Sequence, residues 1–294
     1  MNQPWLLKAA ALQILRLLPT SAYDFLTKRI TKRSGRRKLF VDETGKPSKY
    51  FSNAQKHANI LKRFIDCETD LVLEFGAGKD LLSNLVMRSF GVKNQLTVDL
   101  NPLVRRAYLN NVLMQMPPGS LDIDTFSDNC EAELQSLGIT YIAPLDLRQT
   151  DMESGSISAI VSTNTLEHIP ERDIGLILKE CFRLLRSGGI CSFKIDYSDH
   201  YAHTDRQLSE YSYLRFSDTT WRFLSPPNHY QNRLRHCDYA ARFSDSSFHI
   251  VVDEPTLQEG RVNDLRRIRV AKKFRSYLVE ELLPTSGWFV LMKD

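Results

Sequence analysis

Apolar residues recur along the chain at two spacings, which predict strands and helices in succession. Short apolar runs predict seven strands, at residues 71–75, 95–100, 139–145, 156–162, 190–195, 249–252 and 287–292. Apolar residues at steps of three and four predict helices at 53–66, 80–90, 171–186, 237–243 and 261–282, and another that begins at residue 102. Strands that alternate with helices in this way are typical of a parallel sheet with right-handed crossovers. We therefore predict an α/β fold with helices on both faces of the sheet.

The alternation breaks after Tyr197, at the end of the fifth predicted strand. About forty residues rich in aromatic side chains and histidine follow before the next helix begins. An insertion at the carboxyl end of a strand commonly forms a lid or a substrate wall. We predict such a lid at about 198–236, within a main domain of residues 51–294.

Residues 1–50 differ in charge from the rest of the chain. They hold eleven Lys or Arg and three Asp or Glu, a net +8, which leaves −4 on the remainder because the whole chain carries +4. Residues 5–18 predict an amphipathic helix ended by Pro19, and Lys8 and Arg16 make it unsuited to span a bilayer. We predict a basic helical extension that packs on the body, forms a dimer, or lies on a membrane surface. Its charge suits lipid head groups, nucleic acid or an anionic substrate.

The five cysteines are scattered and form no C-x-x-C pair. This pattern favours reduced thiols over a disulfide framework or a zinc site. The region before the apolar run at the N-terminus lacks the positive charge of a secretory signal. The predicted location is cytoplasmic, with peripheral contact at the inner face of the membrane as a second use of residues 5–18. The sequence leaves the oligomeric state open.

Polar residues and glycines follow the predicted parallel strands, so they should lie along one edge of the sheet. They are Glu74, Gly76, Gly78, Asp99, Asp146 and Asn164. Glycine lets the backbone approach a ligand that a Cβ atom would block, and it adopts dihedral angles closed to other residues. Asp99 stands 25 positions after Glu74, a suitable place to accept hydrogen bonds from two ribose hydroxyl groups.

The order of these motifs resembles that of the class I S-adenosylmethionine-dependent methyltransferases. The resemblance extends from Leu71 to Ile195, through E-F-G-A-G, L-T-V-D-L, P-L-D-L, S-T-N-T-L-E-H-I and L-L-R-S-G-G-I. It implies a Rossmann-like seven-stranded sheet with an antiparallel last strand, S-adenosylmethionine as cofactor and S-adenosylhomocysteine as product. Most members of that family have proline in the turn before the fifth strand, where this chain has Ser187.

The resemblance also implies roles for individual residues. It places the methionine and ribose part of the cofactor at Glu74, Gly76, Ala77 and Gly78. It places the ribose hydroxyl groups at Asp99 and Leu100, the adenine amine at Asp146 and Leu147, and the sulfonium beside Asn164. A nicotinamide-binding fold is the rival reading, but its third glycine should stand where this chain has Leu81.

The residues after the fourth strand bear on the atom that receives the methyl group. Relatives that act on amide or base nitrogens carry an N-P-P-Y-like tetrad there, and this chain reads N-T-L-E. Nucleic acid is therefore disfavoured as a partner. We predict transfer to an oxygen of a small molecule or glycan. The alternatives are an RNA or protein methyltransferase and a non-catalytic binding or assembly protein.

The segment D-Y-S-D-H-Y-A-H-T-D, residues 196–205, leaves the fifth strand on the side expected for the acceptor. A carboxylate orients an imidazole so that its free nitrogen removes a hydroxyl proton. We predict His200 as the general base, with His203 as a less favoured candidate and Asp199 in support. A second hypothesis uses Asp196, Asp199, His200 and His203 as ligands of Mg²⁺ or Mn²⁺. A metal is not favoured, and histidine in a loop is often only structural.

The predicted lid mixes aromatic and arginine side chains. Aromatic faces stack on sugar rings and arginine binds phosphate or carboxylate. We predict acceptor contacts at Tyr197, Tyr230, Asn232 and Arg233. Packing of the lid for stability is the alternative role of each.

Overall fold

One mixed sheet organises the chain. The structure is a computed structural model that describes residues 38–203, 207–225, 230–258 and 260–294. The strands are β1 (Leu71–Phe75), β2 (Asn94–Val98), β3 (Ile139–Ile142), β4 (Ile157–Thr163), β5 (Leu185–Asp196), β6 (His249–Thr256) and β7 (Ser286–Met292). Their order is β3-β2-β1-β4-β5-β7-β6, and only β7 runs antiparallel to its neighbours. The predicted Rossmann-like α/β fold with an antiparallel last strand is confirmed.

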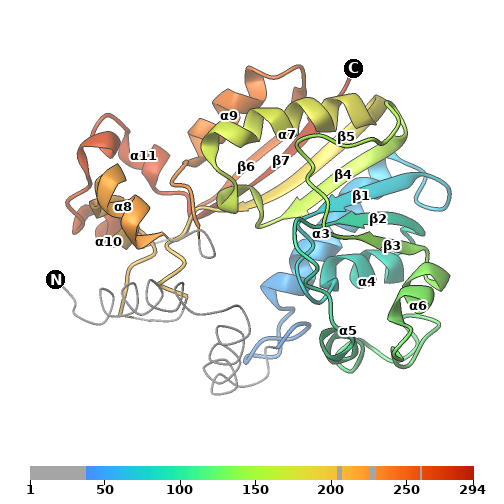
Figure 1. Cartoon of the computed structure of the whole chain (residues 1–294). Coiled ribbons are helices and arrows are strands. Elements are labelled where there is room, and N and C mark those ends of the chain that lie inside the picture. The colour runs from blue at the N-terminus through green and yellow to red at the C-terminus, as the bar shows by residue number, and fades with distance from the viewer. Residues whose placement is uncertain (1–37, 204–206, 226–229, 259) are drawn as a thin grey trace.

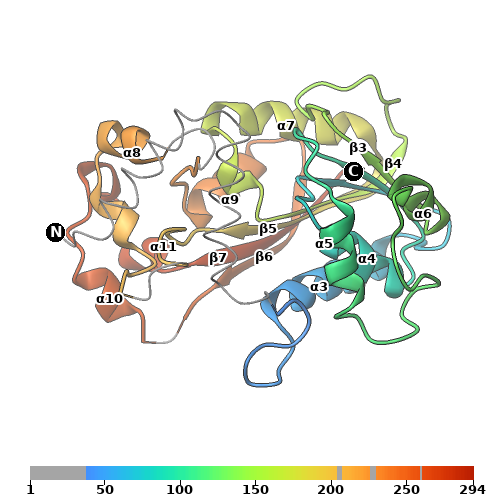
Figure 2. The same ribbon diagram turned by 60° about the horizontal axis from the view of Figure 1, so that its bottom comes forward.

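Helices cover both faces of the sheet (Figures 1 and 2). One face carries α3 (Lys49–Phe64) and α4 (Leu82–Ser89), and the other carries α7 (Glu171–Leu184) and α9 (His236–Ser244). Two short helices, α5 (Arg106–Leu113) and α6 (Cys130–Ser136), pack with α4 beside the β3 edge. The sequence did not predict α6, whose only buried residue is Leu134.

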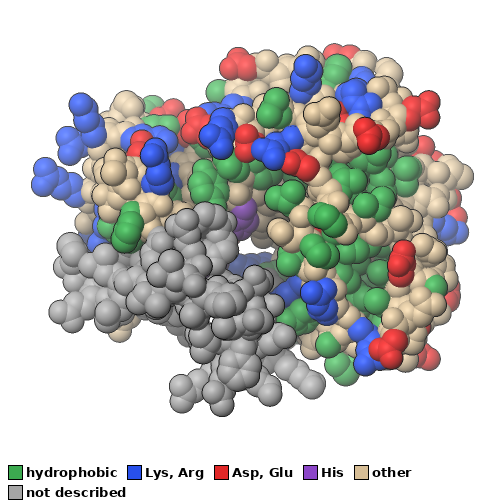
Figure 3. Space-filling view, in the orientation of Figure 1, with side chains coloured by type: hydrophobic (Ala, Val, Ile, Leu, Met, Phe, Trp, Pro, Cys, Tyr) green, Lys and Arg blue, Asp and Glu red, His purple; other side chains and the backbone are tan. Residues whose placement is uncertain are grey.

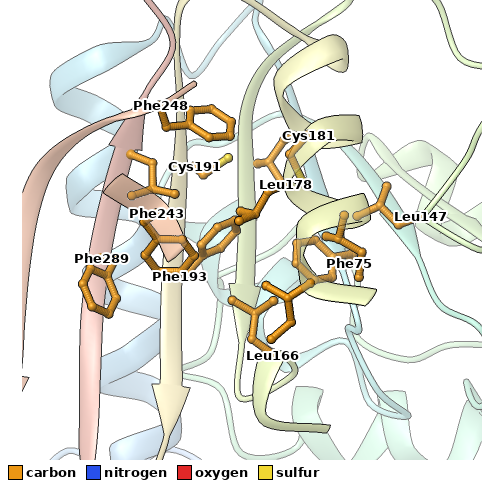
Figure 4. Packing of buried hydrophobic residues seen from close by; sticks show 14 of the residues in the cluster. Phe75, Leu147, Leu166, Leu178, Cys181, Cys191, Phe193, Phe243, Phe248 and Phe289 are labelled. Carbon is orange, nitrogen blue, oxygen red and sulfur yellow. The ribbon is translucent and has the colours of Figure 1, made fainter. Parts of the chain in front are cut away.

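Side-chain alternation along the strands divides the core into two layers. On the α7 side, Phe75 and Phe193 pack against Leu178 and Cys181 (Figure 4). On the α3 side, Leu61 packs with strand residues that include Trp288. The same alternation sends Glu74 from β1 and Lys194 from β5 to the α3 side, near the carboxyl ends of their strands. That side therefore holds the polar groups of the edge.

His57 of α3 is a buried polar link between the helix and the sheet. Its Nδ1 lies 3.0 Å from the Ser192 hydroxyl and its Nε2 lies 3.0 Å from the Thr163 hydroxyl. Its ring centroid is 4.5 Å from that of Trp288. Burial first, then the charges of Lys56 and Lys194, lower the pKa of His57 to about 3. The imidazole is therefore neutral in the folded protein at physiological pH.

This pKa predicts an acid-sensitive fold. The unfolded chain binds a proton at His57 below its ordinary pKa of 6.5, whereas the folded chain binds it only near pH 3. Stability from His57 is thus complete above about pH 6.5 and falls as acid is added. We expect a loss of about 2–3 kcal/mol at pH 4.5. Chemical denaturation at pH 7 and pH 4.5 should show a smaller pH effect in His57→Gln, and an unchanged effect in His249→Asn, a control on an exposed histidine.

A small second core joins two segments that are far apart in sequence. The segment after β5 contains the short helices η2 (Ser212–Arg215) and α8 (Asp218–Leu224), and the segment between β6 and β7 contains α10 (Val262–Arg266), η4 (Lys272–Phe274) and α11 (Val279–Leu282). Tyr213 and Trp221 of the first segment pack with Leu265, Phe274 and Leu282 of the second. Figure 1 shows α8, α10 and α11 as a group at one end of the sheet.

The predicted single helix at 261–282 is wrong because of this packing. The buried apolar residues of that stretch, Leu265, Phe274 and Leu282, are nine and eight positions apart and belong to three separate turns. In one continuous helix, steps of nine and eight residues would place these three side chains on different faces, so they could not all reach the second core. The predicted lid is therefore only half of the unit that stands at this end of the sheet.

Two of the boundaries that differ from prediction have a local cause. Helix α3 begins at Lys49, four residues earlier than predicted, because the Ser48 hydroxyl caps it by accepting from the Phe51 amide at 3.2 Å. Strand β5 begins at Leu185, which pairs with Ile157 before the register shifts. Gly188 has a φ of +71°, so the glycines form an irregularity inside the strand instead of ending the helix.

The predicted amphipathic helix at 5–18 lies outside the described residues. Within the described end of the basic extension, Leu39 and Phe40 are buried with the α4 cluster. None of the helices that the structure describes is long and apolar enough to cross a membrane.

Candidate functional site

The turn after β1 combines close packing with open space. Gly76 has a φ of +70° and Gly78 has a φ of +74°. A Cβ atom on Gly76 would lie 2.3 Å from Thr165, so glycine lets the turn pack against the end of β4. A Cβ atom on Gly78 would meet nothing within 4 Å. The backbone at Gly78 therefore faces space that a ligand can enter.

Asp99 ties this turn to the end of β2. The Gly78 amide donates to Asp99 Oδ2 at 3.2 Å, and the Asn101 amide donates to Oδ1 at 3.0 Å. Asp99 is only 7% exposed, whereas the neighbouring Leu100 is 60% exposed. Each carboxylate oxygen keeps a lone pair for a further donor. Asp99 thus offers two acceptor oxygens, and Leu100 provides an exposed apolar side chain beside them.

Glu74 and Asn164 each place a buried oxygen at this edge that has no hydrogen-bond partner among the described residues. Glu74 is 2% exposed, and its Oε2 has no partner within the described residues. Burial raises the pKa of Glu74 to about 8, although hydrogen bonds from Ser83 and Asn84 oppose the shift. The Oδ1 of Asn164 is likewise buried without a partner in the part of the chain that the structure describes, and Asn164 has a φ of +52°. Unsatisfied buried oxygens next to an open turn are suited to a ligand that donates hydrogen bonds.

The other predicted cofactor residues, Asp146, Leu147 and Ala77, each contact other protein groups. Arg148 holds the Asp146 carboxylate with its Nε 3.0 Å from each oxygen, and this bond lowers the pKa of Asp146. The Leu145 amide donates to the Asp99 carbonyl at 2.9 Å, which brings this loop beside Asp99. Leu147 is buried in the core with Phe75 (Figure 4). Ala77 is partly buried against the α4 cluster.

Two histidines lie beside a carboxylate at the end of β5. His200 Nε2 is 4.0 Å from Asp196 Oδ2, and His203 Nε2 is 3.7 Å from the same oxygen. The Ser198 hydroxyl bridges Asp196 and His203, at 2.5 and 2.9 Å. The His200 side chain is 12% exposed and that of His203 is 38% exposed. The structure thus brings both predicted histidines together, but with Asp196 as their carboxylate.

Asp199 has another place in the fold. It is fully buried, its Oδ1 accepts from the Tyr201 amide at 2.9 Å, and its own amide donates to the Glu210 carbonyl at 2.7 Å. These bonds hold the loop that carries His200. Its predicted support of the base stays a prediction.

Glu167, in the turn η1 (Leu166–His168), was missed at the sequence level as a site residue. It is 1% exposed, and neither carboxylate oxygen makes a hydrogen bond to another described residue. Burial and the charge of Asp196 raise the pKa of Glu167 well above its ordinary value. Glu167, His168 and His200 each offer one ligand atom, all within 4.8 Å of one another. This set differs from the predicted metal ligands and shares only His200 with them.

The predicted acceptor contacts from the lid are mostly engaged elsewhere. Asn232 donates to the carbonyls of Leu166 and Ile169 at 2.9 and 3.0 Å, which fixes the lid on the η1 turn. Arg233 is 4% exposed and forms an ion pair with Asp218. Tyr197 is 2% exposed and its hydroxyl lies 3.0 Å from His236 Nδ1. These three side chains stabilise the lid and the core, which favours the structural alternative for them.

Tyr230 stays near the predicted site. It is partly buried, and its carbonyl oxygen lies 2.7 Å from His168 Nδ1. His168 in turn has its ring centroid 4.9 Å from that of His200. The lid therefore reaches the histidine group at this residue.

A sequence model of the family described as "Methyltransferase domain" matches residues 41–242. The chain belongs to that family. The match contains the glycine turn, Asp99, Asn164 and the β5 histidines, so the class I S-adenosylmethionine-dependent methyltransferase predicted from the motifs is confirmed. No curated protein matches the sequence.

Several solved structures resemble this methyltransferase at low sequence identity. An S-adenosylmethionine-dependent methyltransferase from Mesorhizobium loti has 14% identity over 83% of this chain and 100% of its own, with a TM-score of 0.47. A Methanosarcina mazei SAM-dependent methyltransferase has 14% identity over 80% and 96%, with a TM-score of 0.44. The CurJ carbon methyltransferase has 14% identity over 83% of this chain and 54% of its own, with a TM-score of 0.46.

The edge of the sheet at the carboxyl ends of the parallel strands suits the cofactor that the family uses. Three neighbouring strands end at the open space of Gly78, the carboxylate of Asp99 and the buried oxygens of Glu74 and Asn164, which have no partner in the part of the chain that the structure describes. S-adenosylmethionine carries an ammonium group, two ribose hydroxyl groups and a positively charged sulfur. The donor groups of the cofactor thus match acceptors that the protein leaves available.

Proposed function

We propose that this methyltransferase transfers a methyl group to an oxygen of a small molecule or glycan, with His200 as the general base. The observation that carries this proposal is the pairing of His200 with Asp196, 4.0 Å apart, at the end of the strand next to β4. The glycine turn follows β1, on the other side of β4 from this strand. The acceptor would bind between them, over Asn164.

The surroundings of His200 support a role in proton transfer. Its side chain is largely buried, which excludes water from a base, yet Asp196 lies on one side and His168 on another. A carboxylate beside an imidazole favours the protonated form that follows proton abstraction. Burial and the charge of Asp196 raise the pKa of Glu167, which lies in the same cluster as His200.

The chemistry is a single displacement. Bound S-adenosylmethionine supplies a methyl group on a sulfonium, an electrophile that needs no further activation. The C–S bond breaks as the new C–O bond forms, the hydroxyl proton passes to a His200 ring nitrogen, and S-adenosylhomocysteine is released. Glu74, Gly78 and Asp99 hold the cofactor in this proposal, and Asn164 with the η1 turn separates it from the lid. Holding the reacting atoms in line contributes about 7–11 kcal/mol, more than the base does.

Cofactor binding is the first test. S-adenosylmethionine at 100 times its Kd should stabilise the wild type by about 2.7 kcal/mol in thermal unfolding. Asp99→Ala should weaken binding about 10- to 100-fold, since it removes charge-assisted hydrogen bonds. Asp151→Ala, at an exposed carboxylate, is the matched control. Absence of any shift in a folded wild type would favour a non-catalytic binding protein.

A further inference from the structure

A pocket of about 430 Å³ opens on the α3 side of the sheet, at Lys194 of β5. Its walls are Ser52, Asn53 and Lys56 from α3, residues 254–257 at the end of β6, Lys194 and Trp288. Lys194, Trp288 and Glu254 lie side by side in register on β5, β7 and β6. Figure 3 shows a hollow on the face turned to the viewer, in which His and Lys or Arg side chains are visible.

The two lysines of this pocket differ in their partners. Lys56 pairs with Glu254 at 2.5 Å and lies over the Trp288 ring, so these two charges offset each other. The ammonium group of Lys194 makes no hydrogen bond or ion pair to any residue in the described ranges. Burial lowers the pKa of Lys194 to about 8, although the charges of Asp196 and Glu167 oppose the shift. A partly buried ammonium group without a partner is costly unless a ligand supplies an anion.

The pocket is also connected to the proposed base. The charges of Asp196 and Glu167 both act on Lys194, and Asp196 Oδ2 lies 4.0 Å from His200 Nε2. The backbone carbonyl of Lys194 accepts from the Asn164 amide at 2.8 Å, next to the proposed methyl donor. Lys194 therefore links the pocket to Asn164 through its backbone and lies two residues before Asp196 on β5.

We propose that the pocket binds the methyl acceptor and that the acceptor is an acid, with a carboxylate or phosphate held by Lys194. This inference rests on the proposed function, whose acceptor it specifies. Ser52 and Asn53 supply a hydroxyl and an amide for the remaining polar groups of the acceptor, and Trp288 supplies an apolar floor that is 3% exposed. The volume suits a single ring, such as one acidic sugar unit, rather than a long chain.

Direct binding tests this assignment without methyl transfer. The full chain, saturated with S-adenosylhomocysteine, is titrated with glucose, glucuronate and glucose 1-phosphate, and binding is followed by ligand-observed NMR. The wild type should prefer at least one acidic sugar over glucose, and the two acids distinguish a carboxylate from a phosphate acceptor. Lys194→Met should weaken binding of that acid about 10- to 100-fold, and Lys194→Arg should restore part of it.

Two controls separate this inference from the proposed function. Lys179→Met removes the same charge from an exposed position on α7, the opposite face of the sheet, and should bind like the wild type. S-adenosylhomocysteine binding by Lys194→Met should also be unchanged, which shows that the variant is folded. Equal binding of neutral and acidic sugars, or an unaltered preference in Lys194→Met, overturns the acid assignment. Failure of the wild type to bind S-adenosylhomocysteine overturns the proposed function instead.

Discussion

Replacing His200 by alanine should lower kcat about 10²- to 10⁴-fold while cofactor binding stays within about twofold of the wild type. The imidazole is the proposed proton acceptor and lies away from the glycine turn, so its loss affects the chemical step. S-adenosylhomocysteine release is measured with the best acceptor from the sugar panel. The acidic limb of the pH–rate profile, which reports loss of a proton from an essential base, should disappear in the same variant.

His203→Ala is the matched comparison for that variant. His203 is more exposed than His200 and shares the Ser198 hydroxyl with Asp196, so its loss should change kcat much less. Equal losses in both variants would assign the pair a structural role. An unchanged kcat in His200→Ala would remove the base from the mechanism.

Chelation separates the base from the metal hypothesis. Glu167, His168 and His200 are spaced to hold an ion, and such an ion would itself activate a hydroxyl group. With His200 as a base, EDTA should leave kcat unchanged. Loss of activity on chelation, followed by recovery with Mn²⁺ or Mg²⁺, would replace the base by a metal bound at this cluster.

The strand ends were predictable from sequence because they depend on local patterns. Each apolar run that ends in glycine or an acid specifies both a buried strand and the polar edge after it, so Glu74, Gly78 and Asp99 were found together. The carboxyl ends of parallel strands meet at one edge whatever the loops between them do. Packing of the loops adds nothing to that placement.

Lys194 and Glu167 were missed for different physical reasons. Lys194 stands in a strand whose alternation, S-F-K-I-D, already puts Ser192, Lys194 and Asp196 on one side, and this signal was available but unused. Glu167 depends on tertiary packing, since the lid residue Asn232 donates hydrogen bonds to the backbone carbonyls of Leu166 and Glu167 in its turn. The same packing explains Arg233, which the sequence offered as a ligand and the second core uses as a partner of Asp218.

The broken helix at 261–282 shows the limit of periodicity more generally. A helix over this stretch assumes a single buried stripe, but the residues pack on a surface formed by another insertion. A sequence window holds no information about a surface built by residues fifty positions away. The lid therefore had a predictable location and an unpredictable interior.

Glu74→Gln should stabilise the protein and weaken the cofactor site at once. The folded state holds Glu74 protonated up to a pKa of about 8, whereas the unfolded state ionises it near 4.5. Ionisation of Glu74 therefore stabilises the unfolded state relative to the folded state as pH rises from 4.5 to 8. The free energy of unfolding of the wild type falls over that range. The neutral amide removes this effect, so we expect Glu74→Gln to be about 3–4 kcal/mol more stable at pH 7.5. Denaturation at pH 5 and pH 7.5 measures the difference, with Glu131→Gln, an exposed helix position, as control.

The same substitution should raise the Kd for S-adenosylmethionine about 10- to 100-fold, because an ionised carboxylate binds an ammonium group more strongly than an amide does. In the wild type, binding of that group should favour the ionised form of Glu74 and release a proton near neutral pH. Calorimetry in two buffers of different ionisation enthalpy detects this release, and Glu74→Gln should abolish it. A stabilised variant with unchanged affinity and unchanged proton release would place Glu74 outside the cofactor site. A gain in stability together with a loss of affinity would show that the buried carboxyl group is retained for binding at the expense of the fold.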